Sequence, residues 1–373
     1  MTVLKAELAR LAKGMFADPI PAAPSVELTV APAQVEDAAA ILRFASKVGL
    51  RVLFWGGGTH QGIGNAVAPD IVMTTHRLDK IVDWQAEDLT IVVEAGVTVS
   101  DLEAQLQQRG QTAVLPESPA GATVGGLVAA GLSGWRRLRY GPTRDRILEV
   151  VLATGDGRVV RGGGPLVKNV TGYDLPRLAT GSLGSLGLIA RLCLKLWPLA
   201  ADRGMVEVAD PQMALRTAYR PLAVIETTER SVAYLAGTRA ELEAQAARLG
   251  GRLVAGHRWP EPLAGPREFV LRVPAGEIGW FVDEMRVNEW AFQAAHGVGE
   301  VRLVVDRGDD EQLARLREEA ENLGGALVAY SSPEDGVFDP WGAAPESADL
   351  QRRVKAAFDP AGVANPGILP GGI

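Results

Sequence analysis

Apolar and polar positions alternate in short runs through the first half of the chain, which predicts β-strands joined by a few helices. The clearest helix is residues 35–48, where apolar side chains recur with a helical period. A second helix is predicted over residues 100–109, with Ser100 as its N-cap. The predicted strands, each a short apolar run, cover residues 27–30, 51–55, 71–74, 80–83, 90–94, 147–152, 158–161 and 187–197.

Two long segments rich in glycine and proline interrupt this pattern, at residues 115–141 and 162–174. Long loops inside a compact domain are uncommon, and where they occur they usually carry function. The first of them, residues 115–141, is therefore predicted to be a functional loop with a helix of small residues inside it.

An internal repeat marks the second half of the chain. Residues 242–255 align with residues 316–329, because both contain a helical stretch, a Leu-Gly-Gly turn and an apolar run. A predicted strand precedes each copy, at residues 232–235 and 301–305. Two such strand–helix–strand units side by side form a ferredoxin-like sheet with helices on one face.

A chain of 373 residues is too long for one typical core, which agrees with more than one domain. The pattern predicts an α+β domain over residues 1–200. A ferredoxin-like α/β cap domain would follow over residues 201–345, and a C-terminal tail over residues 346–373.

Composition narrows the function classes. Hydrophobic residues make up 47% of the chain and charged residues 22%, as in ordinary globular proteins. The net charge of −7 argues against nucleic-acid binding, because such proteins carry a basic surface. Neither a signal peptide nor a membrane-spanning segment is apparent, so we expect a soluble cytoplasmic protein. The single cysteine, Cys193, excludes an internal disulfide and an iron–sulfur cluster held by this chain's own cysteines.

The first candidate site is the segment Trp55-Gly-Gly-Gly-Thr-His-Gln-Gly62, which directly follows a predicted strand. Three successive glycines let backbone N–H groups converge on an anion such as a pyrophosphate, and Thr59 adds a hydroxyl donor. The segment differs from the dinucleotide-binding fingerprint because no long helix follows it. Taken alone, it fits a plain tight loop equally well.

Three further segments are rich in glycine and small residues. In residues 116–126, a flat ring could lie against small side chains, with Thr123 and the amides of Gly125 and Gly126 free to donate. Each segment alone could be ordinary loop architecture, whereas four in this order are far more specific. The three are Pro-Glu-Ser-Pro-Ala-Gly-Ala-Thr-Val-Gly-Gly at 116–126, Lys-Asn-Val-Thr-Gly-Tyr-Asp at 168–174 and Gly-Ser-Leu-Gly-Ser-Leu-Gly-Leu-Ile at 181–189.

In this order, the segments resemble the FAD-binding domain of the vanillyl-alcohol-oxidase/PCMH flavoprotein superfamily, over residues 25–200. Within it, the chain is most similar to the FAD-binding E-subunit family of bacterial glycolate oxidases. The resemblance implies an α+β fold, a PCMH-type two-subdomain FAD-binding domain with a ferredoxin-like α/β cap domain. The two subdomains would meet near residue 85, and the C-terminal tail would return to the FAD-binding domain. It covers most of the chain, more weakly over residues 201–345, and rests on residues 56–59, 122–126, 140–145, 168–174, 181–184 and 358–367.

The resemblance also implies how FAD would be held. The loop at residues 56–62 would bind the pyrophosphate, and residues 116–126 would line the isoalloxazine and ribityl groups. Residues 187–189 would lie near the adenine, with Tyr173, Asp174 and Asn365 near the reactive side of the flavin. The predicted FAD-binding residues are Gly56, Gly57, Gly58, Thr59, His60, Gly62, Pro116, Ala122, Thr123, Gly125, Gly126, Tyr140, Asp145, Gly187, Ile189, Tyr173 and Asn365.

The chain departs from the wider superfamily in its first loop and in the turn at residues 181–184. Some members attach the flavin covalently through a histidine directly after a Gly-Gly pair, but here that position is Thr59 and His60 follows it. We therefore predict non-covalent FAD, with His60 packed or hydrogen-bonded as a loop residue. In the Gly-Ser-Glu-Gly turn of the superfamily, Leu183 replaces the acid.

The cap region also departs from the pattern. Members that oxidise 2-hydroxy acids by themselves resemble one another in a histidine-rich, metal-binding cap and in a catalytic histidine. This chain has four histidines, and the two in the cap region, His257 and His296, lack the spacing of metal ligands. No metal site is predicted, and no catalytic residue is assigned.

Five arginines cluster around the first long loop. They could meet FAD phosphates, an acidic substrate or the acidic surface of a partner, and local ion pairs explain them equally well. They are Arg136, Arg137, Arg139, Arg144 and Arg146.

The leading hypothesis is an FAD-binding subunit of a glycolate (2-hydroxy acid) oxidase or dehydrogenase complex, taking part in flavin-mediated oxidation of glycolate to glyoxylate. The expected partners are a sister FAD-binding catalytic subunit and an iron–sulfur subunit of the same complex. Any membrane association would be through a partner. Two alternatives stay open: a self-sufficient FAD-dependent D-2-hydroxy acid dehydrogenase, and a non-catalytic flavoprotein-like assembly subunit.

Overall fold

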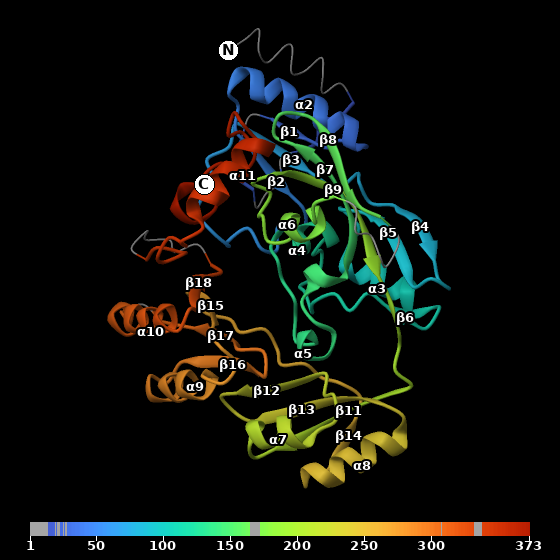
Figure 1. Cartoon of the computed structure of the whole chain (residues 1–373), viewed down its shortest axis with the longest axis vertical. Helices are drawn as coiled ribbons and strands as arrows, with labels where there is room; N and C mark the ends of the chain where they lie inside the picture. Colours follow the sequence, from blue (N-terminus) through green and yellow to red (C-terminus); the bar gives the residue numbers. More distant parts are fainter. Residues whose placement is uncertain are drawn as a thin grey trace.

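The computed structural model describes residues 14–18, 20, 23–24, 26, 28–164, 172–306, 308–331 and 338–373. Sheets of three, five and eight strands organise this part of the chain (Figure 1). A short ladder of β6 (Gln111–Thr112) and β10 (Trp197–Pro198) adds a fourth sheet. Of the predicted segment at 168–174, the residues up to Thr171 lie outside the described residues.

The N-terminal sheet is parallel and is covered by one helix. Across the sheet, its strands are β1 (Thr29–Val30), β3 (Ile71–Thr74) and β2 (Val52–Trp55). Because β2 and β3 run parallel, both end at the same edge, where the residues that follow them can line a common site. Helix α2 (Val35–Val48) covers the sheet with one apolar face, made of Ala38, Ile41, Leu42 and Ala45.

The second sheet is antiparallel, and helices share its core. Helices α3 (Val99–Gln107) and α4 (Val124–Ala129) pack their apolar residues against its strands, and α6 (Leu175–Ala179) contacts β7 and β8. In spatial order the strands are β4 (Ile81–Gln85), β5 (Thr90–Glu94), β9 (Gly187–Lys195), β7 (Ile147–Thr154) and β8 (Val159–Gly163).

Helix α3 begins one residue earlier than predicted. Its N-cap is Thr98, whose Oγ1 accepts a hydrogen bond from the Asp101 amide at 3.1 Å. The prediction of Ser100 as the cap is therefore wrong. Ser100 is already inside the first turn, whereas Thr98 has the extended backbone that an N-cap needs.

The eight-stranded antiparallel sheet contains two complete βαββαβ units joined edge to edge through β12 and β16. Each unit places its fourth strand beside its first, as ferredoxin-like folds do. The first unit is β11 (Asp202–Val208), α7 (Pro211–Thr217), β12 (Ala223–Thr227), β13 (Ser231–Gly237), α8 (Arg239–Leu249) and β14 (Leu253–Ala255). The second is β15 (Glu268–Arg272), α9 (Ile278–Val287), β16 (Ala291–His296), β17 (Glu300–Val304), α10 (Asp310–Asn322) and β18 (Ala326–Ala329).

The repeat detected in the sequence is thus half of the structural repeat. The aligned copies correspond to α8–β14 and α10–β18, and each ends a longer unit whose first half has diverged in sequence. The second halves of the two units can be aligned in sequence because α8 and α10 end at the same Leu-Gly-Gly turn. The division of the chain into domains at residues 200 and 345 stays a prediction.

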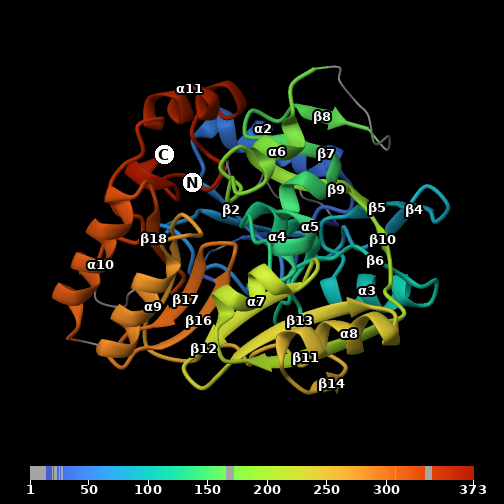
Figure 2. The ribbon, with the colours of Figure 1, turned by 60° about the horizontal axis from the view of Figure 1, so that its bottom comes forward.

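The helices of this sheet lie on its outer face, away from the other two sheets (Figures 1 and 2). The opposite face is turned toward the short helix α5 (Arg137–Tyr140), which contacts β12. The 3₁₀ turn Thr143–Arg146 follows α5 and leads into β7. The inner face of the cap sheet therefore borders the long loop between α4 and β7.

The C-terminal tail returns to the N-terminal sheet. Helix α11 (Ala348–Phe358) lies beside it, and Ala364 forms a parallel bridge with Val52 of β2. A short 3₁₀ turn, Pro370–Gly372, ends the chain. The tail thus lies alongside β2 from its first residue, Val52.

None of the helices in the described part of the chain combines the length and the apolar character needed to cross a membrane.

Candidate functional site

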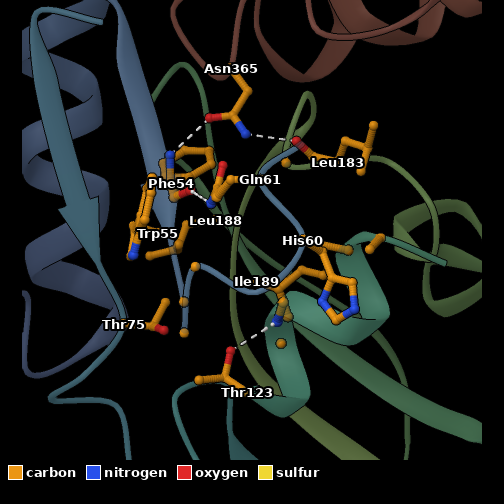
Figure 3. Close-up of a pocket in the computed structure, with 18 of the residues that line it drawn as sticks. Phe54, Trp55, His60, Gln61, Thr75, Thr123, Leu183, Leu188, Ile189 and Asn365 are labelled. Carbon is orange, nitrogen blue, oxygen red and sulfur yellow. Dashed lines mark hydrogen bonds between the residues drawn. The ribbon is translucent and has the colours of Figure 1, made fainter. Parts of the chain in front are cut away.

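A cleft of about 720 Å³ lies where the ends of β2 and β3 meet α4, the turn before β9 and the tail (Figure 3). The structure brings most of the predicted cofactor-binding residues together along it. Those that line the cleft are Gly56, Gly57, Gly58, Thr59, His60, Thr123, Gly125, Gly126, Gly187, Ile189 and Asn365.

The glycine loop after β2 presents unused backbone donors. Among the described residues, the amides of Gly57, Gly58 and Thr59 have no hydrogen-bond acceptor. The glycines are also required by packing, because a Cβ on Gly57 would lie 1.8 Å from the carbonyl oxygen of Gly121. The loop is therefore pressed against the segment at 116–122 and keeps donors available to an anion.

The start of α4 differs from the prediction. The amide of Gly125 donates to the Ala95 carbonyl at 2.8 Å, and the amide of Gly126 donates to Thr123 Oγ1 at 3.2 Å. The prediction that these two amides are free is therefore wrong. Thr123 is the N-cap of α4, and a Cβ on Gly125 would lie 2.4 Å from the Ala95 Cβ. These glycines serve the packing of α4 on the sheet.

Helix α4 offers the cleft a flat face of small residues. Gly126, Ala129 and Ala130 are spaced i, i+3, i+4, line the cleft and are half-buried. The other residues of the helix, including Val124 and Leu127, are buried in the core. A planar ring can therefore lie against α4 without meeting a long side chain.

The hydroxyl of Thr75 is buried in the cleft wall and has no hydrogen-bond partner among the described residues. Thr75 lines the cleft with an exposed fraction of 6%, and within the described residues its Oγ1 has no hydrogen-bond partner. Because a buried hydroxyl is normally paired, Thr75 fits a polar ligand group in the cleft. The unused loop amides, the Thr75 hydroxyl and the flat face of small residues on α4 together suit a dinucleotide that carries a planar ring.

The predicted FAD-binding residues account for half of the lining, and Trp55, Gln61, Leu183, Gly184 and Leu188 lie within the candidate segments 55–62 and 181–189. A usable signal existed for Thr75, which directly follows β3, and for Ala129 and Ala130, which continue the helical face of Gly126. For the others, only the tertiary arrangement brings the side chains to the cleft. The lining residues outside every candidate segment are Phe54, Ile63, Thr75, Ala129, Ala130 and Ile368.

Asn365 lines the cleft, but both polar atoms of its side chain form hydrogen bonds to the protein backbone. Its Oδ1 accepts from the Phe54 amide at 2.9 Å, and its Nδ2 donates to the Leu183 carbonyl at 2.7 Å, as Figure 3 shows. With an exposed fraction of 4%, this amide fastens the tail to β2 and to the turn before β9. Leu183 itself has a φ of 48°, a strained value for a non-glycine residue.

Six predicted residues lie outside the cleft. Two are engaged elsewhere: Tyr140 packs edge-on against Trp197 with ring centroids 5.6 Å apart, and Asp145 pairs with Arg177 at 2.8 Å. Tyr173 is 92% exposed. These three residues belong to the segments 140–145 and 168–174 that carry the family resemblance, but their side chains do not line the cleft. The six are Gly62, Pro116, Ala122, Tyr140, Asp145 and Tyr173.

The remaining three lie close to the cleft without lining it. Ala122 is buried, and its carbonyl accepts from the Val99 amide at 2.9 Å. Gly62 follows the loop and is half-buried. Pro116 lines a second cavity, under the cap sheet, whose wall also includes His60 and Arg302.

His60 stands in the wall between the cleft and this second cavity. Its Nδ1 lies 2.8 Å from Thr59 Oγ1. Burial, together with the nearby charge of Arg302, lowers the pKa of His60 below its ordinary value. The imidazole is therefore neutral near pH 7. Its Nδ1 and the Thr59 hydroxyl can form one hydrogen bond, and the tautomer of His60 decides which of the two donates.

The histidines of the cap region serve structure. His296 is buried, with its Nε2 2.6 Å from Glu226 on the neighbouring strand β12. The Nε2 of His257 lies 2.8 Å from the Leu235 carbonyl oxygen. In the described part of the chain, no three His, Cys, Asp or Glu side chains gather as a metal site would require.

Cys193 lies in β9 at the centre of the five-stranded sheet and is fully buried. Burial, with the nearby Glu149 carboxylate, raises the pKa of its thiol to about 12. The thiol therefore stays protonated near neutral pH and has no access to a partner or a cofactor.

Comparison with known proteins agrees with this geometry. A family model described as an FAD binding domain matches residues 26–163. Glycolate oxidase subunit GlcE of Escherichia coli (strain K12) is 31% identical over 309 residues, which cover 77% of this chain and 83% of that protein. Glycolate oxidase subunit GlcD of Bacillus subtilis (strain 168) is 34% identical over 178 residues, covering 46% of this chain and 37% of that protein.

Among solved structures, an alkyldihydroxyacetonephosphate synthase superposes with a TM-score of 0.64 at 14% identity. The match covers 91% of this chain and 76% of that one. At this identity the likeness concerns the fold alone. The predicted fold class is confirmed: an α+β, PCMH-type FAD-binding domain of two subdomains with a ferredoxin-like cap.

Proposed function

The chain belongs to the family of glycolate oxidase subunit GlcE, and from this premise we propose that it is the FAD-binding subunit of an enzyme complex that oxidises glycolate or a similar 2-hydroxy acid. The observation that carries the proposal is the cleft itself. It combines unpaired loop amides, an unpaired buried hydroxyl and a flat face of small residues, which together suit FAD.

Each wall of the cleft would contact a different part of FAD or hold a neighbouring wall in place. The amides of Gly57, Gly58 and Thr59 would hold the pyrophosphate, and Thr75 would pair with a polar group of FAD. The face of α4 would pack against the ring, and Asn365 would keep the turn before β9 in place. When bound, FAD supplies the two-electron redox chemistry, and this chain supplies binding, orientation and exclusion of water.

The cofactor is held without a covalent bond in this proposal. Thr59 occupies the place where superfamily members with a covalent flavin carry a histidine. His60 is neutral, and its Nδ1 is already within hydrogen-bond distance of the Thr59 hydroxyl.

The proposed partners are a sister FAD-binding catalytic subunit and an iron–sulfur subunit. Similarity to GlcE extends over most of that protein, whereas similarity to GlcD covers 37% of it, which supports the GlcE-like role. With one buried cysteine, this chain cannot ligate an iron–sulfur cluster by itself. The proposed location is the cytoplasm, with any membrane association made through a partner.

Purification of the tagged chain from its native cell tests this function. We expect a yellow complex that contains a second flavoprotein and an iron–sulfur protein, and whose flavin absorbance is bleached by glycolate without oxygen. Bleaching of the isolated chain by glycolate would favour a self-sufficient dehydrogenase instead. A colourless chain that takes up no added FAD would indicate a non-catalytic assembly subunit and contradict the proposal.

A further inference from the structure

The arginine cluster around the loop between α4 and β7 separates into two groups. Arg137 and Arg144 line a cavity beside the cleft. The other three are held by neighbouring groups: Arg136 by Glu117 at 3.0 Å, Arg139 by the Ala236 carbonyl at 3.0 Å and Arg146 by Thr143 at 2.7 Å.

We call the space beside the cleft the arginine cavity, because its wall contains Arg137, Arg144 and, from β15 of the cap sheet, Arg272. The described residues that line it include no acidic side chain. Three guanidinium groups around one cavity create a positive potential that attracts an anion. The cavity lies between the loop after α4 and the inner face of the cap sheet.

A carboxylate at the edge of the cavity does not neutralise this charge. Within the described residues, Arg137 and Arg272 share one ion partner, Glu300, at 3.8 and 3.3 Å. Arg302 lies 3.9 Å from the other oxygen of the same carboxylate. Three arginines therefore share Glu300, and the remaining N–H groups of Arg137 and Arg272 can bind a second carboxylate. The third arginine of the cavity, Arg144, lies 3.9 Å from Asp145, which also pairs with Arg177.

A tyrosine adds a neutral donor to the cavity. Arg272 Nη2 donates to the hydroxyl oxygen of Tyr330 at 2.6 Å, and Tyr330 lines the cavity. A hydroxyl that accepts one hydrogen bond keeps its own proton for another acceptor. Tyr330 can thus donate to an oxygen of a ligand that Arg272 holds.

The arginine cavity and the cleft share part of their walls. Ile63, Ala130 and Leu183 line both. Ala130 continues the face of α4 against which the ring of FAD would pack. A ligand in the arginine cavity would therefore lie next to the proposed flavin site and not at a distant surface.

We propose that the arginine cavity binds the carboxylate of a small 2-hydroxy acid beside the flavin. Arg137, Arg144 and Arg272 hold the carboxylate, and Tyr330 donates to the same ligand. The inference rests on the proposed function and deepens it: this subunit's own flavin meets an anionic substrate and does not serve electron relay alone. The excess of positive charge also favours dianions over monoanions.

Oxalate is a suitable probe, because it is a small dianion that cannot be oxidised as a 2-hydroxy acid. Its binding to the full FAD-loaded chain is measured by calorimetry and by the change in the flavin absorption spectrum. We expect Arg137→Gln and Arg144→Gln each to weaken oxalate binding about tenfold or more, because a charge-assisted hydrogen bond is lost.

Arg177→Gln is the matched control. Arg177 and Arg144 both lie beside Asp145, at 2.8 and 3.9 Å, but Arg177 is not part of the cavity wall. This variant should bind oxalate within about twofold of the unmodified chain, since its charge faces solvent. Flavin content should stay unchanged in all three variants.

Three results would overturn the inference. The first is a chain that keeps FAD but binds no oxalate, and the second is equal oxalate binding by the Arg137 and Arg144 variants and the control. The third is loss of FAD from the Arg137 and Arg144 variants, which would assign these arginines to the cofactor's phosphates. A chain that takes up no FAD at all would instead contradict the proposed function, so the two failures are distinguishable.

Discussion

Replacing Ala129 by leucine should weaken FAD binding by at least about tenfold while the protein still folds. Ala129 lies on the face of α4 that lines the cleft, where a planar ring needs space. Three added carbon atoms would occupy that space, and overpacking of this kind costs about 1–3 kcal/mol, or about one to two orders of magnitude in affinity. FAD titration of the apoprotein, followed by flavin fluorescence, measures the change.

The matched control is Ala247→Leu. Ala247 also lies in the last turn of a helix, α8, but it is exposed on the outer side of the cap. Both variants should show the circular dichroism of the unmodified chain, and only Ala129→Leu should lose flavin. Unchanged FAD affinity in Ala129→Leu would contradict the placement of the ring against α4. A substitution at Gly57 is less informative, because it would push apart two loops in direct contact.

Lys355→Met should produce the largest loss of stability, about 3–5 kcal/mol in the free energy of unfolding. The Lys355 ammonium donates to Asp359, to the Ser185 carbonyl and to the Ala364 carbonyl, each at 2.7 Å. Asp359 has no solvent exposure of its side chain, so the substitution leaves a buried carboxylate without its cation. Burial lowers the pKa of Lys355, with Asp359 opposing the shift.

Chemical denaturation monitored by tryptophan fluorescence measures this loss. Lys47→Met, in the exposed last turn of α2, makes the same change of side chain away from any buried partner and should cost less than about 1 kcal/mol. Because Lys355 holds the tail against the turn before β9, its variant should also release FAD more easily. Equal stability of the two variants would show that the buried pair does not anchor the tail.

The glycine-rich segments led to the cleft for a physical reason. A run such as Gly56 to Gly58 signals that the backbone approaches something closely, and in the structure Gly57 is pressed against Gly121 while the run lines the cleft. The same reasoning failed at Gly125 and Gly126, whose amides are used inside the fold. Sequence shows that a glycine is needed, but only the tertiary contacts show whether it serves a ligand or packing.

Residues of unremarkable type were the hardest to predict. Thr75 gains its importance from the parallel pairing of β2 and β3, which brings the ends of two strands far apart in sequence to one edge. Arg272 belongs to the cap and reaches the arginine cavity only because the inner face of the cap sheet borders the loop after α4. Tyr140 and Tyr173 show the converse: both lie in recognisable motifs, but neither lines the cleft.

We expect the cleft to hold one FAD without a covalent bond. To test this, the chain is purified, its visible absorption spectrum is recorded and it is precipitated with acid. We predict about one flavin per chain, with all of the flavin in the supernatant and identified as FAD. Flavin that remains with the precipitate would contradict the non-covalent site, and a colourless chain that takes up no FAD would contradict FAD binding altogether.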